Sequence, residues 1–174
     1  FTLADLGIRI QPIGESLQMD TLSGTLPPAL ASIATHIARD SGLTVLPVLT
    51  YLANAIHARG RSVPYSLAAA LPLDALPLPR TPAPLPANPI VLNDWTARDL
   101  GGRPGDTTTL DYYVWKDAGR RVTESSGFTL AAITPIAGLA ADRHLTPEYP
   151  GITDASSVSD WDPPFPMDLS LIRP

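Results

Sequence analysis

The stretch at residues 90–115, IVLNDWTARDLGGRPGDTTTLDYYVW, contains the clearest local structural signals in the chain. The apolar run at 90–92 predicts a strand, and Asn93 follows it as a residue type that caps helices. Asp94 suits the positive end of such a helix, and the glycine pair at 101–102 predicts where it ends. This part of the sequence therefore predicts a strand that runs directly into a short helix.

A predicted β-hairpin follows this helix. The turn-forming residues 104–106 lead into a run of β-branched and aromatic residues at 107–115, which is typical of a strand. Asp117–Arg120 is predicted to form the hairpin loop, and the returning strand is predicted over 128–136, FTLAAITPI.

Three aromatic residues of this region have predicted environments. Tyr113 and Trp115 lie two residues apart in a strand, so they share one face of the sheet and are expected to pack across strands. Trp95 lies three residues after Leu92 and is expected in the core.

The N-terminal region predicts a strand pair and a helix. Residues 6–10 alternate between apolar and polar types, and residues 17–21 continue the pattern in a second strand. The prolines at 27–28 suit a helix start and Gly42 suits its end, which predicts a helix over 27–40. The apolar stripe expected to face the core of this helix is Leu30, Ile33, Ala34 and Ile37.

The central region predicts a second strand pair and a long connection. Residues 43–56 resemble a strand, and Pro47 predicts an edge or bulged position for it. The turn at 59–61 predicts a hairpin into a strand at 62–71. Residues 72–89 hold seven prolines and almost no charge, which favours an extended surface connection.

Together these elements predict an α+β fold with mixed or antiparallel sheets and two short helices. The predicted domain covers residues 1–138. Residues 139–174 carry two basic and six acidic side chains and many prolines, and they are expected to form an irregular acidic arm.

Composition excludes several classes of protein. The chain has 174 residues, 44% of them hydrophobic, a size that folds without disulfides or metals. Its formal net charge of −5 argues against a sequence-independent nucleic-acid binder and against adsorption to an anionic membrane surface. The absence of cysteine excludes thiolate catalysis and zinc–thiolate sites in this chain.

No catalytic or metal-binding constellation is visible in the sequence. It contains no phosphate-binding glycine-rich loop and no nucleophile elbow. The histidines His36, His57 and His144 lie far apart and lack the spacing of paired metal ligands, so each is expected to be structural, with His57 exposed to solvent.

The acidic arm supplies the only candidate site residues. Tyr149, Trp161 and Phe165 lie among prolines and could anchor the arm, either onto the domain itself or onto a partner, and self-packing is the simpler expectation. Asp160 and Asp162 flank Trp161, and their oxygen-rich surroundings suggest Ca²⁺ as an alternative. The ordered spacing of a calcium loop is absent, which favours a solvated acidic face.

The segment 90–137 resembles the extracytoplasmic domain of MacB/FtsX-type ABC transporter permeases. In that family a Val-Leu-Asn strand end leads into a short helix, a Gly-Asp turn and two strands. The matching residues are Val91, Leu92, Asn93, Ala97, Leu100, Gly105, Asp106, Phe128 and Ile133. Ala132 departs from the family's usual glycine.

The resemblance implies a soluble, non-catalytic domain on the extracytoplasmic side of a bacterial cytoplasmic membrane, without a cofactor. It would couple to a cytoplasmic ATP-binding partner through membrane helices outside this segment, in a protein that would usually work as a dimer. The domain would recognise a substrate, lipoprotein, peptide or periplasmic protein. On this view Phe1 follows a first membrane helix and the domain continues beyond Pro174.

Two other functions stay open from the residues themselves. One is a free-standing secreted module that binds glycan or peptide through Tyr149, Trp161 and Phe165. The other is a hydrolase that uses scattered Asp and His residues. No mutually supporting catalytic pair is visible for the second, which makes it the weakest of the three.

Overall fold

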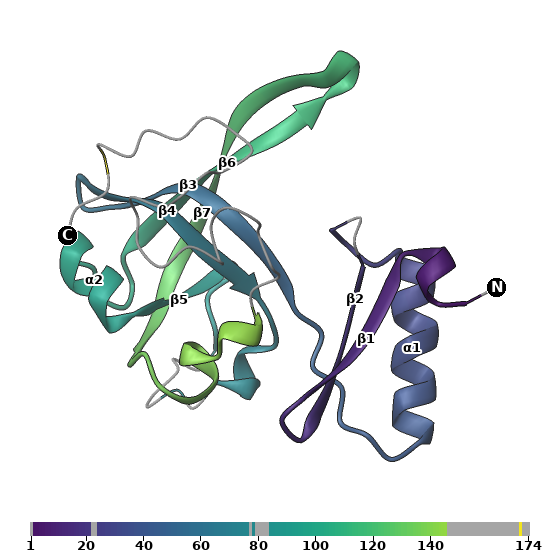
Figure 1. Cartoon of the computed structure of the whole chain (residues 1–174). Coiled ribbons are helices and arrows are strands. Elements are labelled where there is room, and N and C mark those ends of the chain that lie inside the picture. Colours follow the sequence, from purple (N-terminus) through teal and green to yellow (C-terminus); the bar gives the residue numbers. More distant parts are fainter. Residues whose placement is uncertain (1, 22–23, 77, 79–83, 146–170, 172–174) are drawn as a thin grey trace. The chain divides into compact units, whose positions relative to one another are not determined.

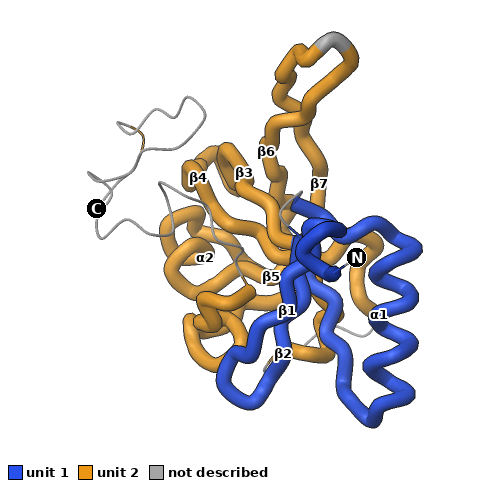
Figure 2. Tube along the Cα trace, turned by 45° about the vertical axis from the view of Figure 1, so that its right-hand side comes forward, with its two compact units in different colours: residues 1–49 blue, residues 50–174 orange. Residues whose placement is uncertain are grey.

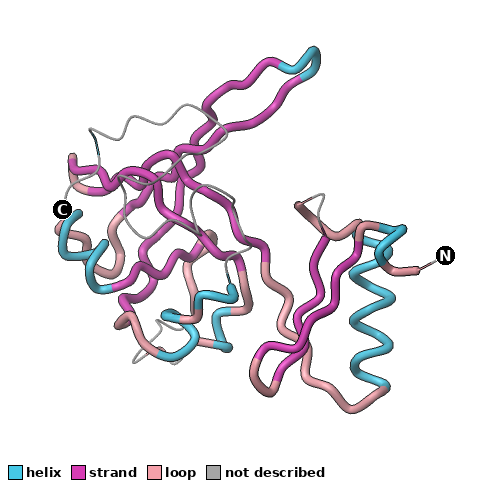
Figure 3. The backbone as a smooth tube through the Cα atoms, viewed as in Figure 1, coloured by secondary structure: helices cyan, strands magenta, loops and turns pink. Residues whose placement is uncertain are grey.

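The computed structural model of the chain describes residues 2–21, 24–76, 78, 84–145 and 171. It divides into two compact units, residues 1–49 and residues 50–174 (Figure 2). The described residues contain two α-helices and two β-sheets, with more residues in strands than in helices (Figure 3). The predicted α+β class is therefore confirmed. The predicted boundary at residue 138 stays a prediction.

The first unit opens with the predicted strand pair. Strands β1 (Ile8–Ile13) and β2 (Ser16–Thr21) form an antiparallel hairpin that follows a short 3-10 turn, η1 (Ala4–Leu6). Arg9 and Asp20 lie opposite each other, and the Nε atom of Arg9 lies 2.9 Å from the Oδ1 atom of Asp20. This cross-strand ion pair fixes the register that the alternation predicts.

The predicted first helix is also confirmed. Helix α1 spans Pro28–Asp40, with proline in its first turn. Gly42 follows it in the left-handed region at φ +76°, and its N–H donates to the carbonyl of Arg39. The N–H of Leu43 then donates to the carbonyl of Ala38, which satisfies another of the helix's last carbonyls.

The predicted apolar stripe of α1 is wrong in part. Leu30 and Ala34 are half-buried, but the side chains of Ile33 and Ile37 are 57% and 59% exposed. The covered side of the helix runs through Leu30, Ala31, Ala34 and Ala38, and is rotated away from the two isoleucines. Helical spacing places Ile33 and Ile37 beside this face, but it does not say which part of an apolar sector is covered.

The second unit contains a five-stranded mixed sheet in the order β4-β3-β6-β7-β5 (Figure 1). Its strands are β3 (Leu49–Ala58), β4 (Arg61–Ala70), β5 (Pro89–Asn93), β6 (Thr107–Lys116) and β7 (Arg120–Thr134). Strand β6 is antiparallel to both β3 and β7, and β5 is parallel to β7. The predicted hairpin at 59–61 is confirmed, because Arg59 and Gly60 have φ values of +51° and +74°.

Two predictions about β3 are wrong. The strand begins at Leu49 rather than at residue 43, so Pro47 precedes it. It is also an interior strand, between β4 and β6. Proline does lie on the edges of this sheet, at Pro64 in β4 and at the first residue of β5, where its missing N–H costs no ladder hydrogen bond.

Strand β7 is longer than predicted. It begins at Arg120 instead of residue 128 and ends at Thr134. Residues 120–127, RRVTESSG, are mostly polar, so their sequence lacks the apolar signal of a covered strand. They pair with β6 from Arg120 onward, and the short 3-10 turn η3 (Asp117–Gly119) closes the hairpin as predicted.

Helix α2 (Asp94–Leu100) forms as the local signals predict. The side chain of Asn93 accepts a hydrogen bond from the backbone N–H of Thr96, with 2.7 Å between the Oδ1 and N atoms. Gly101 ends the helix at φ +66°. The cap joins the last residue of β5 to the helix, so it also sets the direction in which α2 leaves the sheet.

Replacing this cap gives a first test of the fold. We expect Asn93→Ala to lower the free energy of unfolding by about 1 kcal/mol, because the N–H of Thr96 loses its acceptor. Urea titration followed by circular dichroism measures the change. Asn93→Asp is the control, because aspartate also caps and should keep most of the stability. Equal losses in the two variants would show that the cap does not stabilise α2.

Helix α2 completes the core of the second unit. Leu100 and Leu130 are fully buried, and they belong to a cluster with Ala53, Ile56, Ala58, Val63, Leu92, Ala97 and Leu110. Trp95 lies outside this cluster with 46% of its surface exposed, so its predicted core position is wrong. Leu92 and Trp95 lie on different elements, a strand and a helix, and their spacing therefore does not place them on one face.

Short 3-10 turns occupy the described parts of the connections. In the proline-rich stretch, η2 (Leu73–Ala75) precedes β5. After β7, the chain forms η4 (Gly138–Ala141) and η5 (Arg143–Leu145). The Thr50 hydroxyl donates to the carbonyl of Leu145 with 2.5 Å between the oxygens, which attaches this last segment to the start of β3.

Candidate functional site

The site residues proposed from sequence fall outside the described structure. Tyr149, Trp161, Phe165, Asp160 and Asp162 all lie within residues 146–170. The aromatic anchor and the Ca²⁺ alternative therefore stay predictions. Within the residues that are described, no group of three His, Asp or Glu side chains could hold a metal ion.

The structure instead brings together three polar side chains from three neighbouring strands. His57 lies on β3, Asp111 on β6 and Ser125 on β7. Asp111 lies directly opposite Ser125, while His57 lies opposite Thr109, two residues before Asp111 on β6. Because side chains two residues apart point to the same face of a strand, all three side chains share one face of the sheet.

The Asp111 carboxylate is the centre of this polar row. The Ser125 hydroxyl donates to its Oδ1 atom at 2.5 Å, and the Nε2 atom of His57 lies 2.8 Å from its Oδ2 atom. The donated hydrogen bond from Ser125 lowers the pKa of Asp111, and the partial burial of the carboxylate opposes this effect. The hydrogen bond and charge of His57 lower the pKa further. The carboxylate is therefore held in its ionised form by both neighbouring strands.

This arrangement corrects two expectations about His57. The imidazole is not simply exposed to solvent, since 42% of its side-chain surface is accessible and it has a carboxylate partner. A mutually supporting His–Asp pair also exists, although none is visible in the sequence. The two residues lie on strands that are far apart in the sequence but neighbours in the sheet, so only the register of β3 on β6 reveals the pair.

The geometry of the row is not that of a nucleophilic triad. In such a triad the histidine lies between the nucleophile and the acid, so that it can take the proton of the hydroxyl. Here His57 and Ser125 both bind the same carboxylate, one on each oxygen. The Ser125 hydroxyl donates to Asp111 rather than to an imidazole. The row thus joins three strands and does not activate a nucleophile.

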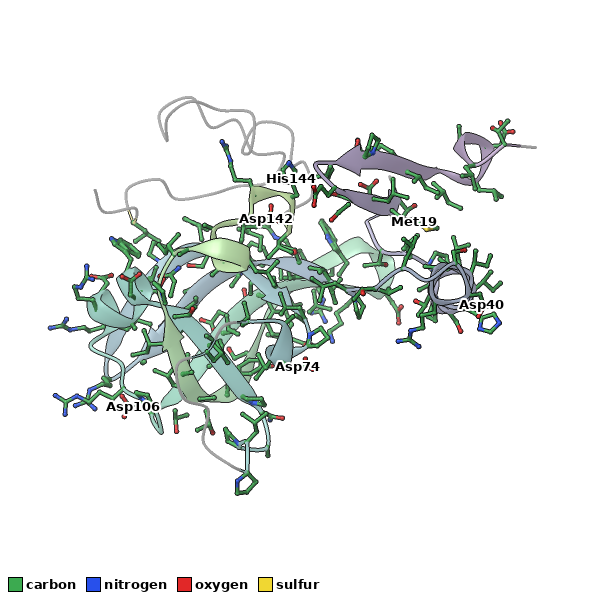
Figure 4. All side chains as sticks on the ribbon, turned by 90° about the horizontal axis from the view of Figure 1, so that it is seen from below. Met19, Asp40, Asp74, Asp106, Asp142 and His144 are labelled. Atoms are coloured by element: carbon green, nitrogen blue, oxygen red, sulfur yellow. The ribbon has the colours of Figure 1, made fainter. Side chains whose placement is uncertain are left out.

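The other two histidines have local partners. The Nε2 atom of His36 lies 3.3 Å from the Asp40 carboxylate, one turn along α1. The Nδ1 atom of His144 lies 2.9 Å from Asp142, which also accepts the backbone N–H of His144 (Figure 4). In each pair, the two residues lie within four positions of each other in the sequence, which agrees with a structural role.

A second notable surface is the distal end of the β6–β7 hairpin. Trp115 is 69% exposed there, so it does not pack across strands as predicted. Tyr113 on the same face does have a packing partner, because the Arg121 guanidinium lies 4.2 Å from its ring centroid. Arg121 is directly opposite Trp115 in the register, so the two residues lie on the same face of the hairpin.

The turn between α2 and β6 is held by Asp106 (Figure 4). Its carboxylate accepts the backbone N–H of Arg103 at 2.8 Å and lies 3.3 Å from the Arg59 guanidinium. The backbone hydrogen bond from Arg103 lowers the pKa of Asp106, and Arg59 adds to this effect. Asp106 therefore ties the turn before β6 to the hairpin turn between β3 and β4.

A shallow depression of about 350 Å³ lies beside this turn, at the end of α2. It is lined by Asp94, Ala97, Arg98, Gly101, Gly102, Arg103 and Ile133. Arg98 is already paired with Asp94 at 3.6 Å, and no buried polar group points into the depression among these residues. It has the form of a surface groove, without the convergent polar groups of a ligand pocket.

Comparison with protein-family models gives no match, and comparison with curated proteins gives no significant relative. Across the described residues, none of the helices combines the length and the apolar character needed to cross a membrane.

Proposed function

We propose that this chain is a non-catalytic extracytoplasmic domain of a MacB/FtsX-type ABC transporter permease. In this role it recognises a substrate or partner and couples mechanically to a cytoplasmic ATP-binding component. The observation that carries the proposal is that the residues of the sequence resemblance assemble into one module, comprising β5, α2, the following turn, β6 and β7.

Each part of the resemblance has a structural role in that module. Leu92, Ala97 and Leu100 are buried in its core, and Phe128 and Ile133 pack against them. Asn93 caps α2, and Asp106 fastens the turn before β6. The proposal is supported by the fact that the residues of the resemblance pack against or cap one another within one module.

The polar row supports a mechanical role rather than a catalytic one. Asp111 links β3, β6 and β7 through side chains, in addition to the backbone ladder between these strands. Its two partners are held by the same carboxylate, so neither is placed to act on the other. Such cross-links stiffen a sheet that has to transmit movement.

Cysteine labelling of the full-length polypeptide tests the proposal. This segment has no native cysteine, so a single substitution supplies a probe within it, and the polypeptide without that substitution gives the background labelling. We expect Asp117→Cys, at the exposed hairpin turn, to react with a membrane-impermeant maleimide in intact cells, in a protein that fractionates with membranes. Ala97→Cys is the matched control, because this buried position should react only after denaturation.

The same experiment distinguishes the alternatives. Labelling that appears only after lysis would place the domain on the cytoplasmic side and overturn the proposal. A labelled protein found in the medium, without a membrane-bound form, would favour the free-standing secreted module instead.

A further inference from the structure

The distal half of the β6–β7 hairpin extends beyond the backbone pairing that joins it to the other strands of its sheet. The register of β3 on β6 covers Thr109–Asp111, and β5 pairs with β7 only from Thr129 onward. Beyond these pairs, residues 112–116 and 120–124 pair with each other as a two-stranded ribbon. Tyr51 of β3 contacts the base of this ribbon, where its hydroxyl donates to the Tyr113 carbonyl and its ring meets the Tyr112 ring edge-on. Figure 1 shows this ribbon extending past the neighbouring strands of the second unit.

The end of the ribbon combines one large apolar side chain with cations. Trp115 is the only large hydrophobic side chain of β6 and β7 that is exposed. Arg120 at the turn and Arg121 opposite Trp115 have no carboxylate partner among the described residues, whereas Lys116 forms an ion pair with Glu124. Arg121 stacks on Tyr113, so its guanidinium lies over the Tyr113 ring, on the same face of the ribbon as Trp115.

The charge of the ribbon opposes that of the whole chain. Residues 113–124 contain three basic and two acidic side chains, against a net charge of −5 for the chain. Five residues of strand extend about 17 Å. This length exceeds the Debye length of about 8 Å at physiological salt. A carboxylate at the base of the ribbon, such as that of Asp111, is therefore largely screened from a surface that touches the tip.

These features favour a bilayer surface over a protein partner. Trp and Tyr concentrate at the level of lipid headgroups, and Lys and Arg are attracted to anionic lipid. A stable protein interface buries about 800 Å² on each partner around its central residues. A two-stranded tip with a single exposed aromatic side chain offers little area for such an interface, whereas lipid headgroups adapt to a narrow tip.

We propose that the β6–β7 tip docks on a bilayer containing anionic lipid, with Trp115 among the headgroups and Arg120 and Arg121 at their phosphates. This inference deepens the proposed function and rests on it for its biological setting, because a domain held beside a membrane has that surface within reach. Docking would fix the orientation of the second unit relative to the bilayer.

Vesicle binding of the purified chain tests this docking. The probes are vesicles of phosphatidylcholine mixed with phosphatidylglycerol, compared at low salt with vesicles of phosphatidylcholine alone. We expect binding to the mixed vesicles only, with most of it lost in Trp115→Ala. Arg121→Gln should weaken binding about fivefold, the contribution of one cation near an anionic surface.

The matched controls are Trp95→Phe and Arg98→Gln. They replace an exposed tryptophan and an exposed arginine on α2, and both variants should bind like the wild type.

Fluorescence gives a second readout that does not depend on the amount bound. In a Trp95→Phe, Trp161→Phe background only Trp115 emits, and mixed vesicles should shift its emission to the blue. Absence of binding, or binding that survives Trp115→Ala unchanged, would overturn the inference and direct attention to a protein partner for the tip. Either result leaves the cysteine-labelling test of the permease role unaffected, and failure of that test leaves the vesicle result intact.

Discussion

Leu130→Ala is expected to lower the free energy of unfolding by about 2–5 kcal/mol, the largest effect of any substitution considered for this chain. Leu130 is fully buried at the point where β7, α2 and the turn before β6 meet. A Cβ atom added at Gly102 would lie 3.3 Å from the Leu130 Cδ2 atom, which shows how closely the leucine fits against the end of α2. The surroundings can fill the resulting cavity only in part.

Urea denaturation followed by tryptophan fluorescence and circular dichroism measures this loss. Leu67→Ala is the matched control, because Leu67 on the edge strand β4 is 43% exposed and should cost less than about 1 kcal/mol. If the two variants lose similar stability, the core of the second unit is not where the structure places it.

Asp111→Asn is expected to destabilise the chain by about 1–2 kcal/mol near neutral pH. The substitution keeps the size of the side chain but removes the charge that binds His57 and Ser125. This loss of stability is at the low end of the range for hydrogen bonds to charged groups, because 27% of the Asp111 side-chain surface is exposed to solvent. Asp117→Asn at the exposed turn is the control and should change stability little.

The effect of Asp111 has a defined pH dependence. Its pKa in the folded chain is lowered from the ordinary value of 3.8, so the folded state favours the ionised carboxylate. The stabilisation it contributes is present above pH 3.8 and is lost as the pH falls below 3.8 through the folded-state pKa. The stability difference between the wild type and Asp111→Asn should therefore shrink in that acidic range. A difference that grows as the pH falls below 3.8 would contradict the assigned interactions.

Local signals allowed several elements to be predicted from sequence. Some signals act within a few residues, so the sequence alone predicts their effect. These are the cap at Asn93, the helix end at Gly42 and the turn at Arg59–Gly60. The strand pair β1–β2 and the helix α1 follow from apolar spacing in the same way. For these elements the sequence and the structure agree to within a few residues.

Features set by tertiary contacts could not be predicted in this way. The His57–Asp111 pair depends on which strands are neighbours and on their register. Trp95, Trp115 and Ile33 have apolar side chains, but their exposure depends on whether another element covers them. The polar N-terminal half of β7 lacks a strand pattern because it pairs as a ribbon outside the core.

Strand β7 is continuous, so it gives the second unit a direct mechanical connection along its length. Its 15 residues pair with β6 near one end and with β5 at the other, so one backbone runs from the hairpin tip to the strand that leads into α2. At about 3.4 Å per residue this is a lever roughly 50 Å long. The tip is therefore linked to the start of α2 by the backbone of β7 and the ladder hydrogen bonds between β7 and β5.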